Sequence, residues 1–170
     1  RRIRYIGINA PEIDHPEYGR NAEPLAYEAL ARNKRLVYRR RIRLEFDTEK
    51  KDRYERWLAY VFLPDGRFVN RILLEAGLAY VLPRYPNTTH ETRLLSAQRE
   101  AMSACRGLWN EPGLKKSLRY WGNSRTRRFH QVSCPFAQKI RKDHRVVFSN
   151  QWDAFWAGYA PAKGCMGKDR

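Results

Sequence analysis

The sequence predicts an α+β fold in which a domain of short strands and helices is followed by a small second module. Strand-like alternation and helix-like spacing of apolar residues replace each other several times along the first two thirds of the chain. Several short strands with helices between them fit a small barrel better than a doubly wound sheet. The charge balance changes near residue 114. Residues 1–114 hold 21 basic and 15 acidic side chains, whereas residues 115–170 hold 13 and 3. The last third is therefore expected to be a distinct unit.

Residues 2–46 predict a strand, a helix and a second strand. The apolar side chains of residues 2–8 fall on one face of a strand. An amphipathic helix is predicted over residues 21–34, because apolar residues recur there at i, i+3, i+4, i+7 and i+8. They are Ala22, Leu25, Ala26, Ala29 and Leu30. Residues 36–46 alternate clearly at their end, which indicates a half-exposed strand.

A hairpin is predicted next, because residues 57–63 and 68–69 flank the turn sequence Pro-Asp-Gly-Arg at residues 64–67. Asn70 has the place of an N-cap for a short helix. Residues 78–82 are predicted to form the next strand.

The last helix of this domain is predicted to begin at a capping box formed by Thr88 and Glu91. One face of this helix carries Leu94, Ala97, Ala101 and Cys105. At that spacing Cys105 is expected to be a small buried core residue.

The composition favours a globular protein that binds a polyanion. A hydrophobic fraction of 42% suffices for a packed core, and no long apolar run predicts a membrane-spanning helix. With 34 basic and 18 acidic residues the formal net charge is +16. Nucleic acid is the commonest polyanion, and binding it releases condensed counterions. A soluble basic protein or a binder of anionic membranes is the alternative, but no basic amphipathic helix supports membrane binding. No protein partner is implied.

Two segments carry residues suited to phosphodiester chemistry. Arg4 begins a segment that runs through an apolar strand to Glu12, and Arg56 stands at the mouth of a later strand. The planar guanidinium of arginine can bind two phosphate oxygens at once, and a carboxylate can accept a proton from an attacking water. The alternative is an ordinary surface ion-pair cluster, which would contribute little to stability.

These segments resemble the staphylococcal nuclease-like (thermonuclease) family. The resemblance rests on Ile8-Asn9-Ala10-Pro11-Glu12, Asp52 to Tyr60, Asp65 to Ala79, Pro86 to Glu91 and Gly107-Leu108-Trp109. It covers residues 1–113 and implies an oligonucleotide-binding-type (OB-type) β-barrel with packed helices. The chain opens without a methionine inside a strand pattern. We therefore expect the first strands of the barrel to be missing from it.

The resemblance implies a calcium-dependent nuclease that cleaves DNA or RNA with little sequence specificity. Glu12 would be the general base, with Arg4 and Arg56 binding the phosphoryl oxygens. The implied nucleic-acid-binding residues are Arg53, Tyr54, Arg84 and Tyr85, although Tyr54 fits barrel packing equally well. An exported or cell-envelope bacterial protein is also implied by the family.

The chain departs from the family pattern at the implied calcium site. Asn9 stands where an aspartate is usual, so its oxygen would ligate calcium without adding charge. Ala10 would ligate through its backbone carbonyl. Glu55 replaces a glycine next to Arg56. These changes support the alternative of a catalytically degenerate nucleic-acid-binding protein on the same fold.

Residues 114–121 are predicted to be a basic linker, and residues 122–170 a small basic α+β module. This module is similar to the zinc-binding domain of the Ada DNA-repair protein, which implies a zinc-ribbon-like metal site at His130, Cys134 and Cys165. The fourth ligand position is Ala162. Three interpretations stay open: a zinc site with an open position, a metal-free fold held by its aromatic core, and a Cys134–Cys165 disulfide. The module is expected to bind nucleic acid backbone.

Overall fold

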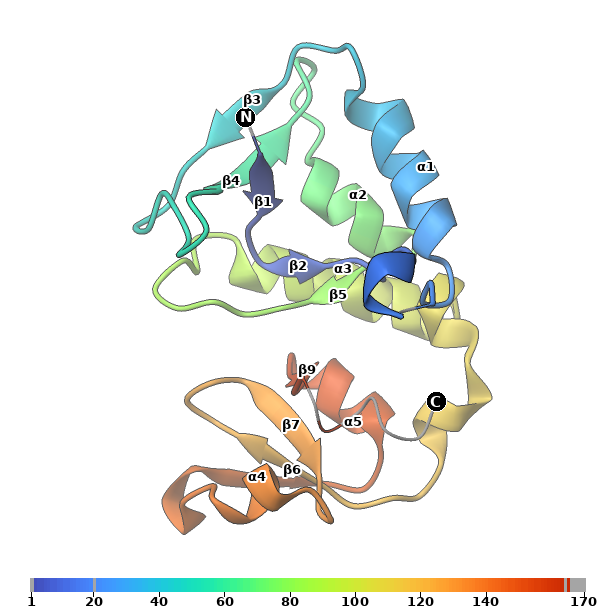
Figure 1. The fold of residues 1–170 in the computed structure, drawn as a ribbon, viewed down its shortest axis with the longest axis vertical. Coiled ribbons are helices and arrows are strands. Elements are labelled where there is room, and N and C mark those ends of the chain that lie inside the picture. Colours follow the sequence, from blue (N-terminus) through green and yellow to red (C-terminus); the bar gives the residue numbers. More distant parts are fainter. Residues whose placement is uncertain (1, 20, 164, 166–170) are drawn as a thin grey trace.

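The computed structural model describes residues 2–19, 21–163 and 165. In Figure 1 the N-terminal domain lies above the C-terminal module, with α3 and the segment that follows it between them. The elements of the N-terminal domain are β1 (Ile3–Tyr5), β2 (Ile8–Asn9), α1 (Ala26–Val37), β3 (Arg43–Glu45), β4 (Trp57–Phe62), α2 (Val69–Glu75), β5 (Tyr80–Val81) and α3 (Glu91–Ser103). Single 3₁₀ turns lie at Pro16–Tyr18, Gly107–Asn110 and Pro112–Lys115.

The α+β prediction is confirmed, but the described strands do not close into a barrel. They form a three-stranded sheet in the order β1-β4-β3 and a separate pair, β2-β5. The strand predicted over residues 2–8 is divided into β1 and β2, because the chain turns at Gly7, where φ is +77°. A Cβ atom at Gly7 would lie 2.5 Å from Leu94 Cδ1, so a larger residue does not fit this turn.

The first predicted helix is displaced along the chain. Leu25 has φ of 63°, which prevents the helix from beginning at residue 21, and α1 continues through Leu36. Leu36 is buried, as are Ala26 and Ala29. Of the strand predicted over residues 36–46, only β3 forms, because the first two residues belong to the last turn of α1.

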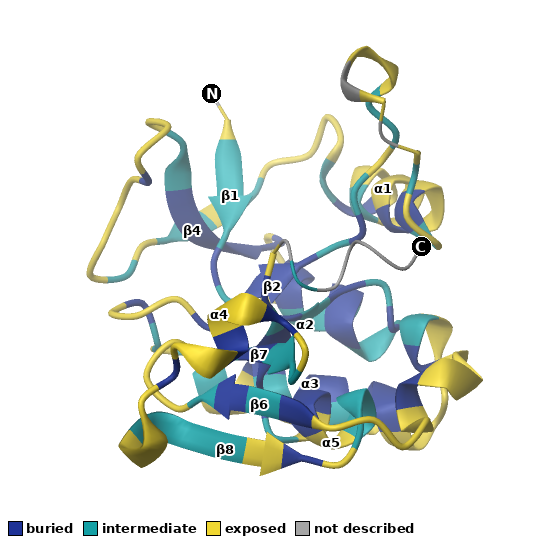
Figure 2. Cartoon of the chain, turned by 60° about the horizontal axis from the view of Figure 1, so that its bottom comes forward, coloured by how far each residue is buried: buried dark blue, intermediate teal, exposed yellow. Residues whose placement is uncertain are grey.

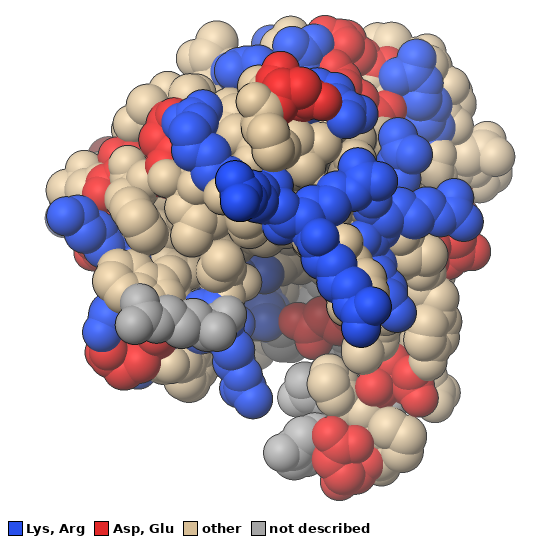
Figure 3. Space-filling view, turned by 90° about the horizontal axis from the view of Figure 1, so that it is seen from above, with Lys and Arg blue, Asp and Glu red and all other residues tan. Residues whose placement is uncertain are grey.

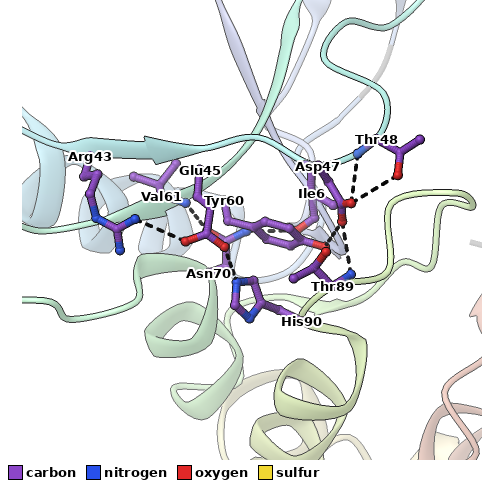
Figure 4. A network of polar contacts seen from close by, with 10 residues as sticks. All are labelled: Ile6, Arg43, Glu45, Asp47, Thr48, Tyr60, Val61, Asn70, Thr89 and His90. Atoms are coloured by element: carbon purple, nitrogen blue, oxygen red, sulfur yellow. Dashed lines mark hydrogen bonds and ion pairs between the residues drawn. The ribbon is translucent and has the colours of Figure 1, made fainter.

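The predicted hairpin turn is present, since the Leu63 amide donates to the Arg67 carbonyl at 2.9 Å. The second arm is a single bridge between Phe62 and Phe68, because α2 begins at once. Asn70 does not cap α2, and that prediction is wrong. Its buried side chain accepts from the Val61 amide at 3.0 Å and donates to the Ile6 carbonyl at 2.9 Å (Figure 4).

The predicted cap of α3 is replaced by a contact to β3. His90 precedes the helix without a side-chain capping bond. Its Nε2 atom lies 2.6 Å from Glu45 Oε1, so His90 joins α3 to the sheet (Figure 4). Cys105 lies beyond the end of α3 with φ of 49° and is exposed. The prediction that Cys105 is a core residue is wrong, because the helix ends at Ser103.

The C-terminal module is built on a four-stranded sheet in the order β8-β6-β7-β9. Its elements are β6 (Tyr120–Asn123), β7 (Arg128–Gln131), α4 (Pro135–Gln138), β8 (Arg145–Phe148), α5 (Gln151–Trp156) and β9 (Ala160–Pro161), with a 3₁₀ turn at Lys142–His144. No helix in the described part of the chain is long and apolar enough to cross a membrane.

The module and the N-terminal domain share a hydrophobic core. Met102 in α3 and Trp109 after it pack in one cluster with Phe129 in β7 and Phe155 in α5. Figure 2 shows buried positions on α3, β6 and β7, where the two parts meet. The Trp109 and Phe155 rings are 5.1 Å apart. Because residues from both sides complete this core, the module is held firmly against α3.

Candidate active site

Arg4 lies at the centre of β1, beside β4. Parallel pairing places it opposite Leu58. The guanidinium is partly buried, and its Nη2 atom donates to Asn9 Oδ1 at 2.6 Å and to the Ile8 carbonyl at 3.3 Å. Among the described residues no group accepts a hydrogen bond from Nε or Nη1 of Arg4. These two nitrogens are therefore available to a ligand.

Asn9 is buried, and both ends of its amide are engaged. Its Oδ1 atom accepts the bond from Arg4. Its Nδ2 atom donates to the Tyr80 hydroxyl at 2.9 Å and to the Ala10 carbonyl at 3.2 Å. Asn9 and Tyr80 are direct partners in the antiparallel β2-β5 pair. These contacts fix the orientation of the amide and, with it, the position of Arg4.

Arg56 is held by a buried carboxylate in the turn before β4. Asp52 Oδ2 accepts from Arg56 Nε at 2.7 Å, and Asp52 Oδ1 accepts from the Tyr54 and Arg56 amides at 2.9 and 3.0 Å. Burial raises the pKa of Asp52, but the hydrogen bonds from Arg56 and the turn amides outweigh it and lower that pKa. Asp52 is therefore an anion that orders the turn and orients Arg56.

Glu12 lies in the loop after β2, with its side chain 43% exposed. A reciprocal pair of bonds fixes this loop: the Glu12 amide donates to Glu23 Oε2 at 2.9 Å, and the Glu23 amide donates to the Glu12 carbonyl at 2.9 Å. One oxygen of the Glu12 carboxylate lies 3.3 Å from Nζ of Lys163, which belongs to the C-terminal module. Glu12 thus faces solvent beside a cation.

Arg56 and Glu12 both act electrostatically on Arg4. Burial lowers the pKa of Arg4, and the positive charge of Arg56 lowers it further, whereas Tyr80 and the negative charge of Glu12 oppose the shift. Arginine nevertheless stays charged at every physiological pH. The structure therefore brings two permanent cations and a solvent-facing carboxylate within electrostatic reach. Their catalytic roles remain predictions.

Comparison with known proteins identifies the family. Residues 2–111 match the family described as Staphylococcal nuclease homologue. The chain belongs to this family. It is 37% identical over 113 residues to the SPbeta prophage-derived endonuclease YokF and 36% identical over 113 residues to endonuclease YncB, both of Bacillus subtilis (strain 168). It is 34% identical over 110 residues to thermonuclease of Staphylococcus hyicus.

Each of these matches covers 65% of this chain. They cover 37%, 52% and 63% of the lengths of the three relatives, in the same order. The residues after 111 lie outside the family match. The family thus accounts for the N-terminal domain and not for the module packed against it.

The oxygens expected to ligate calcium already accept hydrogen bonds here. Asn9 Oδ1 accepts from Arg4, and the Ala10 carbonyl accepts from Asn9 Nδ2. A calcium ion takes 6–8 oxygen ligands, usually with several carboxylates. Glu12 and Glu23 both offer carboxylates in this region, but Glu23 Oε2 accepts from the Glu12 amide and the Arg4 guanidinium occupies Asn9 Oδ1. The described residues do not fit a calcium shell in this arrangement.

One of the family-implied nucleic-acid residues, Tyr54, lines a surface depression. Arg2, Lys51, Tyr54, Glu55, Arg56 and Trp57 line a hollow of about 450 Å³. Tyr54 is 63% exposed, so it is not barrel packing, and the Arg53 guanidinium lies 4.8 Å from its ring centroid. Arg84 and Tyr85 are exposed on the loop after β5, and the charge of Arg84 also lowers the pKa of Arg4.

The structure brings the three predicted zinc ligands of the module together. The ligand atoms of His130, Cys134 and Cys165 all lie within 4.8 Å of one another. The two cysteines form a disulfide, and His130 Nδ1 is 3.2 Å from Cys165 Sγ. Burial lowers the pKa of His130. Because zinc is bound by thiolates, a zinc ion and this disulfide exclude each other.

Sequence reasoning missed three residues that contact the site. Asp52 could have been found, since an aspartate at the start of a turn commonly accepts a bond from the amide two residues on, as it does here from Tyr54. Tyr80 showed only the pattern of a short strand. Lys163 is 151 positions from Glu12 in the sequence, and no local pattern predicts such a contact.

Proposed function

We propose that this chain is a nuclease that hydrolyses phosphodiester bonds of DNA or RNA with little sequence specificity. One observation carries the proposal: Arg4 lies in β1, Arg56 directly precedes the paired strand β4, and the Glu12 carboxylate acts on the same Arg4 guanidinium as Arg56. Membership in a family whose relatives are named endonuclease and thermonuclease supports the same reaction.

The proposed roles follow from which atoms are free. The two unbonded nitrogens of Arg4 and the exposed side of Arg56 bind the non-bridging phosphate oxygens and stabilise the charge that builds on them. Glu12 accepts a proton from a water that attacks the phosphorus. The bond to the leaving sugar oxygen then breaks, and that oxygen takes a proton from solvent. The hollow beside Tyr54 receives the neighbouring nucleotide.

The low sequence specificity is supported by the kind of residues at the site. Arginines and exposed tyrosines contact phosphates and stack on any base, because every base has an aromatic face. Arg53, Tyr54, Arg84 and Tyr85 are of these two kinds. We assign them to the nucleic acid on either side of the cleaved bond.

Calcium dependence remains a prediction from the family resemblance. Asn9, Ala10 and Glu12 carry the oxygen types that calcium binds, yet the first two already accept protein hydrogen bonds. No step of the mechanism above is assigned to the ion. The zinc site at His130, Cys134 and Cys165 likewise remains a prediction, which holds only when the two cysteines are reduced.

The deciding experiment measures cleavage of a fluorescent single-stranded DNA by the full chain with calcium, with chelator, and as Glu12→Ala. We expect Glu12→Ala to lower kcat by at least about 100-fold, the lower end of the range for loss of a general base. Glu28→Ala, which removes an exposed carboxylate on α1, is the matched control. Equal cleavage by the wild type and Glu12→Ala would rule out the proposed base.

A second candidate function is nucleic-acid binding without cleavage. The engagement of Asn9 Oδ1 by Arg4 favours it, because that oxygen is then unavailable to a metal. The same assay separates the two functions. Salt-sensitive binding of DNA without cleavage under any metal would leave the binding function alone.

We also propose that the protein acts in an oxidising compartment outside the cytosol. The Cys134–Cys165 disulfide supports this placement, because such bonds are rare in reducing cytosol. Protein isolated from its source under thiol-blocking conditions should carry one blocked cysteine, Cys105. Three blocked cysteines would contradict the proposal.

A further inference from the structure

Tyr80 in β5 touches both parts of the molecule. On one side its ring packs against Phe155 of α5, with ring centroids 5.6 Å apart. On the other side its hydroxyl accepts a hydrogen bond from Asn9 Nδ2 at 2.9 Å. Tyr80 thus lies between the C-terminal module and the residue that holds Arg4.

A fully buried glutamine fixes the distance between β5 and α5. Gln98 in α3 has no exposed surface. Its Oε1 atom accepts from the Val81 amide at 2.6 Å, and its Nε2 atom donates to the Phe155 carbonyl at 2.7 Å. One side chain therefore ties the residue next to Tyr80 to the residue that packs on Tyr80.

The contacts continue from Asn9 to Arg4 without a gap. The Asn9 amide donates to Tyr80 at one end and accepts from Arg4 at the other, at 2.6 Å. An amide held in this way has one orientation, because rotating it would place Nδ2 against the Arg4 guanidinium, a donor against a donor, and Oδ1 against the Ala10 carbonyl, an acceptor against an acceptor. A change at Tyr80 is thereby passed to the Arg4 guanidinium.

We propose that the C-terminal module positions Arg4 through Phe155, Tyr80 and Asn9, and so forms part of the active site. Tyr80 is a positioning residue in this proposal, which rests on the proposed function of Arg4. It gives residues 112–165, which lie outside the family match, a role in the reaction.

A second contact from the module reaches the other side of the site. Lys163 Nζ lies 3.3 Å from Glu12 Oε1. The segment that carries Lys163 is anchored by β9, which pairs with β7, and by the Cys134–Cys165 disulfide. The module therefore contacts Glu12 directly and reaches Arg4 through Tyr80 and Asn9.

The test is Tyr80→Phe in the full chain, which removes the hydroxyl and keeps the ring on Phe155. We expect kcat/KM on single-stranded DNA to fall roughly tenfold, because small displacements of a catalytic group are costly. Tyr120→Phe is the matched control. It removes another hydroxyl of the shared core, one that accepts from Gln151 at 3.1 Å and has no link to Arg4. Equal activity of Tyr80→Phe and wild type would overturn the proposal.

A double-mutant cycle separates positioning from a merely structural effect. In an Arg4→Ala background, Tyr80→Phe should cause no further loss, since no guanidinium remains to be positioned. An equal loss in both backgrounds would overturn the proposal. If Arg4→Ala alone leaves cleavage unchanged, the proposed function of Arg4 fails instead.

A binding measurement covers the case in which Arg4→Ala is too slow to assay. Wild type, Tyr80→Phe, Arg4→Ala and the double variant are each given the additional change Glu12→Gln. Their dissociation constants for a single-stranded oligonucleotide are then compared at fixed salt. We expect Tyr80→Phe to weaken binding only where Arg4 is present. Weakening of the same size without Arg4 would again overturn the proposal.

Discussion

Glu55 holds a strained backbone conformation beside Arg56. Its φ is 59°, in the left-handed region that is unfavourable for residues with a Cβ atom. The family-implied glycine at this position would adopt the left-handed conformation without strain. Glu55 also adds a negative charge next to a proposed phosphate ligand, although Lys51 Nζ lies 2.6 Å from its carboxylate.

We predict that Glu55→Gly raises the free energy of unfolding by about 0.5–1 kcal/mol, since relief of the strain exceeds the added freedom of the unfolded chain. Urea unfolding measures this change. Glu55→Gln separates charge from strain: both variants should bind single-stranded DNA more tightly, but only the glycine should be more stable. Equal stability of the two variants would mean that the turn holds no strain.

Single residues differ in how far the sequence reveals them. Short sequence motifs contain Arg4, Glu12 and Arg56, so these residues could be proposed as catalytic from the sequence alone. Asn9 was recognised by position, but its bond to Tyr80 was not, because partners 71 positions apart leave no local pattern. The same limit hid Lys163.

At the scale of elements, β3 and α3 are joined by Glu45 and His90. The hydrogen bond from His90 lowers the pKa of Glu45, and Arg43 lowers it further. A carboxyl group whose pKa is lower when folded stabilises the protein above its unfolded pKa. That stabilisation is lost as the pH falls through the folded pKa.

We therefore predict that Glu45→Gln costs roughly 1 kcal/mol of stability at pH 7, and that this cost shrinks as the pH falls through the folded pKa of Glu45. Urea unfolding from pH 7 to pH 3 measures the difference between variant and wild type. Glu28→Gln, an exposed change on α1, should follow the wild type at every pH. If the stability difference between Glu45→Gln and wild type is the same at every pH, the loss comes from packing and not from the charge of Glu45.

The elements were predicted better than their boundaries. The order of strands and helices followed from apolar spacing, and the turn at residues 64–67 followed from its Pro-Asp-Gly-Arg sequence. The break at Gly7 was not visible, because it depends on the approach of Leu94 from α3. The start of α1 was misplaced, because Leu25 continues the apolar pattern while its backbone is left-handed.

At the scale of the whole molecule, two units of different charge were predicted, but not their shared core. The aromatic residues of the module looked sufficient for a core of their own. In the structure Phe155 instead packs with Trp109 and Tyr80 of the preceding domain. Contacts between units depend on shape, which spacing along a chain does not encode.

Positive charge gathers at the end of the molecule that carries the α1–β3 loop. Residues 32–43 contain seven basic side chains and no acidic one. They are Arg32, Lys34, Arg35, Arg39, Arg40, Arg41 and Arg43, all exposed. Figure 3 views this end and shows a dense group of blue side chains. Tyr38 is exposed among them, with Lys34 Nζ 5.1 Å from its ring centroid.

We predict that this surface binds the phosphates of a long substrate away from the cleaved bond. Changing Arg39, Arg40 and Arg41 together to glutamine should reduce the slope of log affinity against log salt by about 2, since each contact to a single strand contributes about 0.7. Cleavage of a substrate of two or three nucleotides should be unchanged, because it does not reach the loop. The triple change to lysine keeps the charge and should keep the slope. If both triple variants lose affinity equally, the loop acts through its conformation, and if neither does, the polymer follows another path.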